Sequence, residues 1–202
     1  MLLANNLSFS RNDKNIFADI NLSLTEGQIT QVRGKNGSGK TTFLKVILNI
    51  LETNTGEIFW RGKNIKKNIF NLYNETTFIL DQKTSTRQLT VLDNINFWRG
   101  LSSSKLNIDK IFLLLETFNI LKYKNTKVMN LSSGEIQKLE LIRLIMEQKK
   151  LWVLDEPYNN LDGLSAEILT QTFLDHSNKN GIVLFTSHFS PQISKMEIID
   201  IK

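Results

Sequence analysis

A glycine-rich stretch at residues 34–42 has the residue types and spacing to hold the phosphates of a nucleotide. It reads Gly34-Lys35-Asn36-Gly37-Ser38-Gly39-Lys40-Thr41-Thr42. The first eight residues match the pattern G-x-x-x-x-G-K-[ST], in which glycines let successive backbone N–H groups turn inward around a polyphosphate. We expect Lys40 to reach the β- and γ-phosphates and the Thr41 hydroxyl to bind Mg²⁺. The alternative is a glycine-rich turn with a solvent-exposed lysine, and the strand and helix predicted on either side argue against it.

Two acidic residues, Asp155 and Glu156, directly follow the apolar segment 151–154. At the carboxyl end of a buried strand beside a phosphate loop, Asp155 is placed to hold Mg²⁺, directly or through water. Glu156 is then the predicted general base, which polarises the water that attacks the γ-phosphate. Taken alone, such a pair would more often cap a helix, so the catalytic interpretation depends on the phosphate loop.

The elements that must position these residues alternate between strand and helix. Strands are predicted at residues 2–9, 16–24, 28–33, 57–60, 77–80, 151–154 and 182–186, and helical periodicity covers 41–51, 91–123 and 135–147. The first two strands alternate apolar and polar residues as antiparallel strands do, whereas the last two are continuously apolar, which is typical of buried parallel strands. We therefore predict a single α/β domain over residues 1–202, with a mixed sheet core, an antiparallel N-terminal β subdomain and an inserted helical subdomain at about 85–148.

Composition narrows the function classes. The chain has 202 residues, of which 41% are hydrophobic and 22% charged, with a net charge of +5 and no cysteine. This excludes collagen-like, coiled-coil and disordered chains, as well as disulfides, Cys-based zinc sites and thiol catalysis. No apolar run reaches the ~18–20 residues of a membrane span, and the N-terminus lacks the features of a signal peptide, so we expect the chain to stay on the side where it is made. Met129, Met146 and Trp152 are predicted core residues, and His176 is predicted on a surface helix without a functional role.

With these motifs, the sequence resembles the nucleotide-binding subunits of ABC transporters, which are P-loop NTPases. Residues 131–135, LSSGE, are similar to that family's signature LSGGQ, with Ser for the first Gly and Glu for the Gln. The resemblance implies that Ser132, Ser133 and Gly134 contact the γ-phosphate bound by a second subunit. Without the neighbouring motifs, the same segment would simply be a capped helix start.

Three further positions match the family in its order. The resemblance implies that Gln82, after strand 77–80, touches Mg²⁺ or the attacking water and senses a membrane partner. Residues 160–162, NLD, are similar to the loop that passes between subunits, and His188 matches the switch histidine that contacts the γ-phosphate. One position departs: Arg11 stands where the family usually has an aromatic residue that stacks on adenine. A guanidinium can also stack on a base, and Phe17 is the alternative, although its apolar flanks favour a core position.

Within the family, the chain looks most like the ATPase subunits that serve cytochrome c maturation, the haem exporter group. Residues 31–37, 89–98, 151–157 and 181–188 carry this similarity. It implies an ATP hydrolase that handles haem for c-type cytochrome biogenesis, with ATP and Mg²⁺ bound in a homodimer that sandwiches the nucleotide. It also implies separate integral membrane subunits of the CcmB and CcmC kind, which contact the helical insert and the Gln82 loop. The expected location is peripheral, on the cytoplasmic face of a bacterial inner membrane or the matrix face of an equivalent organelle.

Other functions remain open at this point. The chain could energise transport of another small substrate, or be a soluble ABC ATPase that acts on ribosomes or DNA, although that class usually has two fused cassettes or a long insertion. A phosphate-loop kinase of small metabolites would lack both the signature and the histidine. The basic segment 63–67 has no accompanying nucleic-acid motif, so no nucleic-acid partner is predicted. Without a Cys-x-x-Cys-His pattern, no direct haem ligation is expected.

Overall fold

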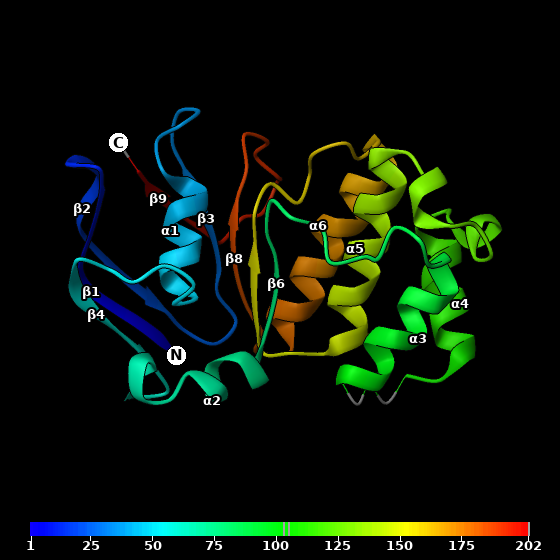
Figure 1. Cartoon of the computed structure of the whole chain (residues 1–202), viewed down its shortest axis with the longest axis horizontal. Helices are drawn as coiled ribbons and strands as arrows, with labels where there is room; N and C mark the ends of the chain where they lie inside the picture. The colour runs from blue at the N-terminus through cyan, green and yellow to red at the C-terminus, as the bar shows by residue number, and fades with distance from the viewer. Residues whose placement is uncertain (103, 105, 202) are drawn as a thin grey trace.

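The structure is a computed structural model that describes residues 1–102, 104 and 106–201. Figure 1 shows an antiparallel sheet with α1 at one end of the molecule, a parallel sheet in the middle and helices α3 to α6 at the other end. The antiparallel sheet has the order β2-β1-β4-β5, from β1 (Leu2–Arg11), β2 (Lys14–Leu24), β4 (Thr55–Trp60) and β5 (Lys63–Asn64). Asn12 and Asp13 join β1 to β2 with φ of 50° and 58°, the left-handed conformation that two-residue hairpin turns require.

The second sheet has five strands in the order β6-β7-β8-β3-β9, and every neighbouring pair is parallel. Its strands are β3 (Ile29–Arg33), β6 (Thr76–Ile79), β7 (Leu151–Leu154), β8 (Ile182–Thr186) and β9 (Met196–Asp200). The α/β fold is confirmed, with the parallel and antiparallel strands in two separate sheets. The sequence did not predict β5 and β9, which are short and lie at sheet edges.

Helices cover both faces of the parallel sheet. Leu151 and Val153 of β7 pack in one core cluster with Phe43 and Leu44 of α1 (Lys40–Ile47). The alternate residues of β7 pack in a second cluster with α5 (Ser133–Glu147) and α6 (Gly163–Asn178). Fully apolar strands are what a sheet covered on both faces requires.

The remaining helices are short or belong to the segment between β6 and β7. They are α2 (Ile69–Asn74), α3 (Val91–Ser102), α4 (Ile108–Thr117) and the 3₁₀ helices η1 (Ile65–Lys67), η2 (Leu121–Tyr123) and η3 (Val128–Asn130). The helical pattern over 91–123 is therefore divided into α3, α4 and η2. None of the helices in the described part of the chain is long and apolar enough to cross a membrane.

Three core predictions have different outcomes. Met146 is fully buried and Trp152 is 3% exposed, so both are confirmed, but Met129 is 54% exposed and the prediction for it was wrong. Met129 lies in η3, a single 3₁₀ turn in which Val128 is the buried residue, so the side chain of Met129 faces away from the core. His176 lies on α6 as expected, but its half-buried ring stacks on the Trp152 indole with ring centres 3.6 Å apart.

Candidate active site

The phosphate loop joins β3 to α1 and opens onto a cavity of about 500 Å³. Gly39 has φ of 97°, and a Cβ there would lie 2.3 Å from Cγ2 of Ile16, so both the backbone and the available space require glycine. Lys40 begins α1, and its Nζ donates to the carbonyl oxygens of Gly34 at 3.1 Å and Lys35 at 3.2 Å. The ammonium group thus lies across the loop, where it would meet a bound phosphate.

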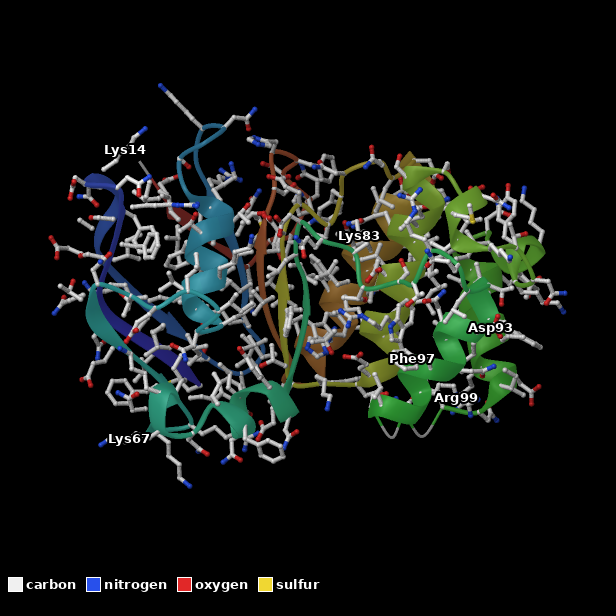
Figure 2. The ribbon with its side chains drawn as sticks, viewed as in Figure 1. Lys14, Lys67, Lys83, Asp93, Phe97 and Arg99 are labelled. Carbon is white, nitrogen blue, oxygen red and sulfur yellow. The ribbon has the colours of Figure 1, made fainter. Side chains whose placement is uncertain are left out.

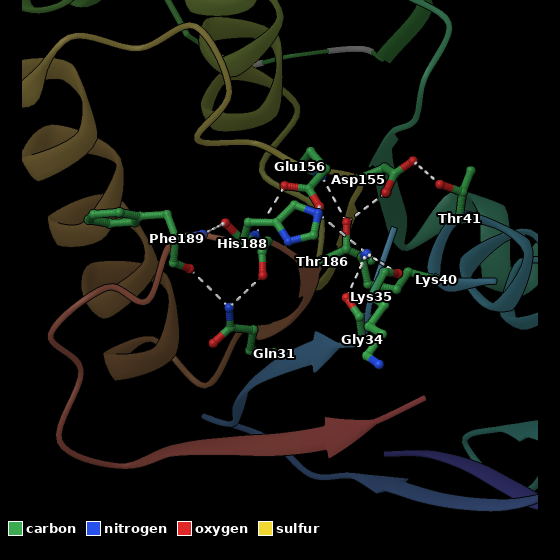
Figure 3. Close-up of polar contacts among 11 residues, drawn as sticks. Gln31, Gly34, Lys35, Lys40, Thr41, Asp155, Glu156, Thr186, His188 and Phe189 are labelled. Carbon is green, nitrogen blue, oxygen red and sulfur yellow. Dashed lines mark hydrogen bonds and ion pairs between the residues drawn. The ribbon is translucent and has the colours of Figure 1, made fainter. Parts of the chain in front are cut away.

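The two acids lie at the carboxyl end of β7, as expected. The Thr41 hydroxyl donates to Asp155 Oδ2 at 2.6 Å, and the Thr186 hydroxyl donates to Oδ1 at 2.6 Å (Figure 3). Thr186 Oγ1 also accepts from the Glu156 N–H at 2.9 Å. Hydroxyl and carboxylate oxygens are the ligands that Mg²⁺ prefers, so Thr41 and Asp155 fit that ion.

His188 follows β8 and faces the same cavity. Its Nε2 lies 3.5 Å from both Glu156 Oε1 and Lys40 Nζ, and the backbone N–H of His188 donates to Glu156 Oε2 at 3.3 Å (Figure 3). Glu156 Oε1 is buried and has no hydrogen-bond partner among the described residues. A carboxylate with a free acceptor in a polar cavity is suited to orienting a water molecule. The cavity therefore combines a phosphate cradle, a carboxylate and an imidazole.

Among the described residues, no group of three His, Cys, Asp or Glu side chains could hold a metal by itself. A magnesium ion at Thr41 and Asp155 would therefore depend on phosphate oxygens and water for its other ligands, as is usual for this ion.

The signature segment lies at the start of α5, away from this cavity. Ser132 caps the helix and exchanges hydrogen bonds with Glu135. Ser132 and Ser133 are both exposed, and neither lines the cavity. A Cβ on Gly134 would lie 2.6 Å from the Asn160 carbonyl oxygen, so glycine allows this close approach. Within one chain, the signature therefore contacts the 160–162 loop and not the cavity at the phosphate loop.

Two other predicted positions also lie outside the cavity. Gln82 lines a separate hollow of about 450 Å³ together with Lys45 and Phe78. Arg11 is exposed at the end of β1 and does not line the nucleotide cavity, whereas Ile16 does. Phe17 is 5% exposed and packs edge-to-face on Phe43, so it is a core residue.

Sequence reasoning missed Ile16 and Asn159 among the lining residues. Ile16 comes one position before the residue that was considered for base stacking, and strand alternation directs neighbouring side chains to opposite faces. That alternation, applied from buried Phe17, is the signal that could have identified Ile16.

The fold and the phosphate site define a P-loop ATPase of the ABC type. The family described as ABC transporter matches residues 17–159, and the chain belongs to this family. It is an ATP hydrolase, as the sequence predicted. A solved structure described as a putative ABC transporter ATP-binding protein from Pyrococcus furiosus is 26% identical, with a TM-score of 0.84, over 99% of this chain and 96% of that one.

Within this family, the chain is similar to ATP-binding proteins of cytochrome c biogenesis. The chain is 31% identical to the cytochrome c biogenesis ATP-binding export protein CcmA of Pasteurella multocida, over 90% of this chain and 85% of that protein. It is 30% identical to the CcmA of Vibrio cholerae over the whole length of both. The fold also matches the dimeric ATP-binding cassette MJ0796 bound to ADP and Pi, with a TM-score of 0.78 and 20% identity over 94% of this chain and 88% of that chain. The family resemblance derived from the sequence is confirmed.

Proposed function

We propose that this chain is the energy-coupling ATPase subunit of an ABC transporter complex that handles haem for c-type cytochrome biogenesis. The observation that carries the proposal is the 30% identity to a cytochrome c biogenesis ATP-binding export protein over the full length of both chains. An ATPase for another small substrate would share the same site, because the nucleotide cavity has no part that recognises cargo.

Each site residue has a role in this proposal. Residues 34–42 hold the ATP phosphates with backbone N–H groups, and Lys40 neutralises negative charge on the β- and γ-phosphates. Thr41 and Asp155 would hold Mg²⁺, which would supply Lewis-acid stabilisation of the phosphate charge, and Gln82 would contact the ion or the attacking water. Glu156 takes the proton of the attacking water, and His188 contacts the γ-phosphate. The free, buried Oε1 of Glu156 beside His188 supports this assignment.

We further propose that two copies sandwich the nucleotides. Ser132, Ser133 and Gly134 lie outside the cavity of their own chain, at an exposed helix N-terminus whose N–H groups and dipole favour a phosphate. A second copy with its cavity facing this segment would supply that phosphate. The fold shared with a dimeric cassette bound to ADP and Pi is consistent with such a pair.

Separate membrane subunits, of the CcmB and CcmC kind, are the proposed partners of the helical segment. Phe97 and Leu101, one turn apart on α3, are 54% and 70% exposed, and Figure 2 labels Phe97 and Arg99 on this helix. The Gln82 hollow offers a second contact. Neighbouring exposed apolar side chains of this kind favour a docking surface. Membrane partners docked there would hold the chain at the cytoplasmic face of the inner membrane, as expected for a subunit of such a transporter.

The test is genetic and biochemical. Deleting the gene should abolish covalent haem staining of c-type cytochromes, and the wild-type chain should restore it whereas Glu156→Gln should not. Membrane proteins that co-purify after mild detergent extraction should include the haem-handling subunits. Normal c-type cytochromes in the deletion strain would favour transport of another substrate, and a chain that never sediments with membranes would favour a soluble ABC ATPase.

A further inference from the structure

Gln31 on β3 is hydrogen-bonded to the backbone on both sides of His188. Its side chain is fully buried, and its Nε2 donates to the carbonyl oxygen of Ser187 at 2.9 Å and to that of Phe189 at 2.9 Å (Figure 3). These are the two residues that flank the histidine. One amide group therefore connects the turn that carries His188 to β3, the strand that leads into the phosphate loop.

Arg33 fixes the orientation of that amide. Its Nε donates to Gln31 Oε1 at 3.0 Å, and its Nη2 donates to the Ser190 hydroxyl at 3.0 Å. An arginine only donates and a backbone carbonyl only accepts, so the Gln31 amide has a single orientation that satisfies all three contacts. The Arg33–Gln31 pair is thus a fixed connection to the turn at residues 187–190.

The His188 ring depends on this connection because few other contacts hold it. Its side chain is 53% exposed, and its Nε2 lies 3.5 Å from both Glu156 Oε1 and Lys40 Nζ, which is the outer limit of a hydrogen bond. After β8 ends at Thr186, the chain forms no helix or strand until β9 begins at Met196. The position of the ring is therefore set largely by the backbone at 187–189.

We propose that Gln31 is a positioning residue for His188 in ATP hydrolysis and that Arg33 orients it. The inference rests on the role proposed above for His188 at the γ-phosphate. Gln31 does not line the nucleotide cavity, so it acts through the histidine and not on the nucleotide. Displacement of a group that stabilises the transition state lowers kcat more than it weakens ground-state binding.

The test compares Gln31→Leu, which keeps the size of the side chain but cannot donate, with Thr30→Val. Thr30 is the adjacent, equally buried residue of β3, and its hydroxyl accepts from Gln28 Nε2 at 3.2 Å. We expect Gln31→Leu to lower kcat about tenfold, equivalent to about 1.4 kcal/mol, with the Kd for ATP within about twofold of wild type. Thr30→Val should leave both constants unchanged.

A double-mutant cycle separates positioning from general destabilisation. In a His188→Ala background, Gln31→Leu should change the residual kcat by less than about twofold, because the group it positions is absent. An equal loss in both backgrounds would overturn the inference. A fully active His188→Ala protein would instead refute the proposed role of the histidine.

An NMR measurement tests the inference without ATP turnover, so it applies even if kcat is too low for the double-mutant cycle. The chain has two histidines, so His176 is an internal control in an NMR spectrum of the imidazole protons. Gln31→Leu should shift and broaden the His188 resonances and leave those of His176 unchanged. Unaltered His188 resonances would overturn the inference. If Gln31→Leu fails to fold, Arg33→Met is the substitute variant, because it retains Gln31. It should lower kcat about threefold and shift the His188 resonances. If neither kcat nor these resonances change, the inference is overturned.

Discussion

Glu135→Gln should strengthen the proposed ATP-dependent dimer. Glu135 Oε2 accepts from the Ser132 N–H at 2.8 Å and from the Ser132 hydroxyl at 2.9 Å. Burial raises the pKa of Glu135, but hydrogen bonds from Tyr123 and Ser132 hold the pKa below its ordinary value, so the group is charged at neutral pH. The Ser132 hydroxyl, which is proposed to contact the γ-phosphate bound by a second copy, therefore already donates to a negatively charged carboxylate.

The size of the effect follows from these distances. A phosphate oxygen hydrogen-bonded to Ser132 Oγ would lie at most about 6 Å from the Glu135 carboxylate. Two unit charges at that distance repel by about 0.7 kcal/mol at the dielectric constant of water and by about 3 kcal/mol at an effective value of 20. With about 1 kcal/mol at each of two sites, the dimer should tighten roughly 30-fold. Glutamine still completes the capping box, so the monomer should lose less than about 1 kcal/mol of stability.

Sedimentation with ATP in a Glu156→Gln background measures the dimerisation constant without turnover. Glu116→Gln on α4 is the matched control, because it removes the same charge from an exposed helical position far from Ser132 in the sequence. The gain from Glu135→Gln should shrink as salt is raised, since the Debye length falls from about 10 Å at 0.1 M to about 3 Å at 1 M. An unchanged or weaker dimer, or an equal gain from the control, would refute the electrostatic reasoning.

Four further outcomes are expected. Lys40→Ala should abolish ATP binding in calorimetry, because the loop then lacks the ammonium group expected to reach the β- and γ-phosphates. Glu156→Gln should hold an ATP-bound dimer in size-exclusion chromatography, and a monomer under those conditions would contradict the sandwich. Glu140→Ala should lower Tm by roughly 6–12 °C, since it leaves the N–H groups of Thr84 and Ser85 unpaired at a cost of about 3 kcal/mol. Burial lowers the pKa of His176 to about 4 from 6.5. The neutral imidazole therefore contributes fully to the free energy of unfolding above pH 6.5, and this contribution is lost as the pH falls toward 4. After allowance for solvent screening this amounts to about 2 kcal/mol, and His176→Gln should flatten that limb of the denaturation curve.

The sequence was sufficient to predict those elements whose local residue pattern also determines their place in the fold. The phosphate loop needs a strand before it and a helix after it, and the apolar run 151–154 has to be buried, so both were correctly placed. The two missed edge elements escaped prediction for different reasons. β5 has only two residues, which form a local hairpin with β4 and are too few to show a strand pattern. β9 pairs with β3, more than 160 residues away, and its residues do not alternate regularly between apolar and polar, so the local sequence does not indicate a strand.

Buried polar residues were the other gap. Glu140 is fully buried and accepts three hydrogen bonds from Thr84 and Ser85, yet in the sequence it resembles any charged residue on an exposed helix face. The same is true of Gln31, which occupies a strand position that could equally face solvent. A polar side chain in the core is recognisable only when its partners are known, and these lie far away in the chain.

The segment after Glu156 and helix α5, which begins with the signature, are joined at three points. Gln137 donates to the Pro157 carbonyl oxygen at 2.9 Å, Gly134 approaches Asn160, and Lys138 pairs with Asp162 at 2.6 Å. The hydrogen bond from Lys138 holds the pKa of Asp162 well below its ordinary value, so the pair stays charged at neutral pH. In the proposed dimer, movement of the signature toward a partner's phosphate would either carry this segment with it or break these contacts. Because the segment directly follows Glu156, we expect binding of one nucleotide to affect the carboxylate at the other through contacts present within each chain.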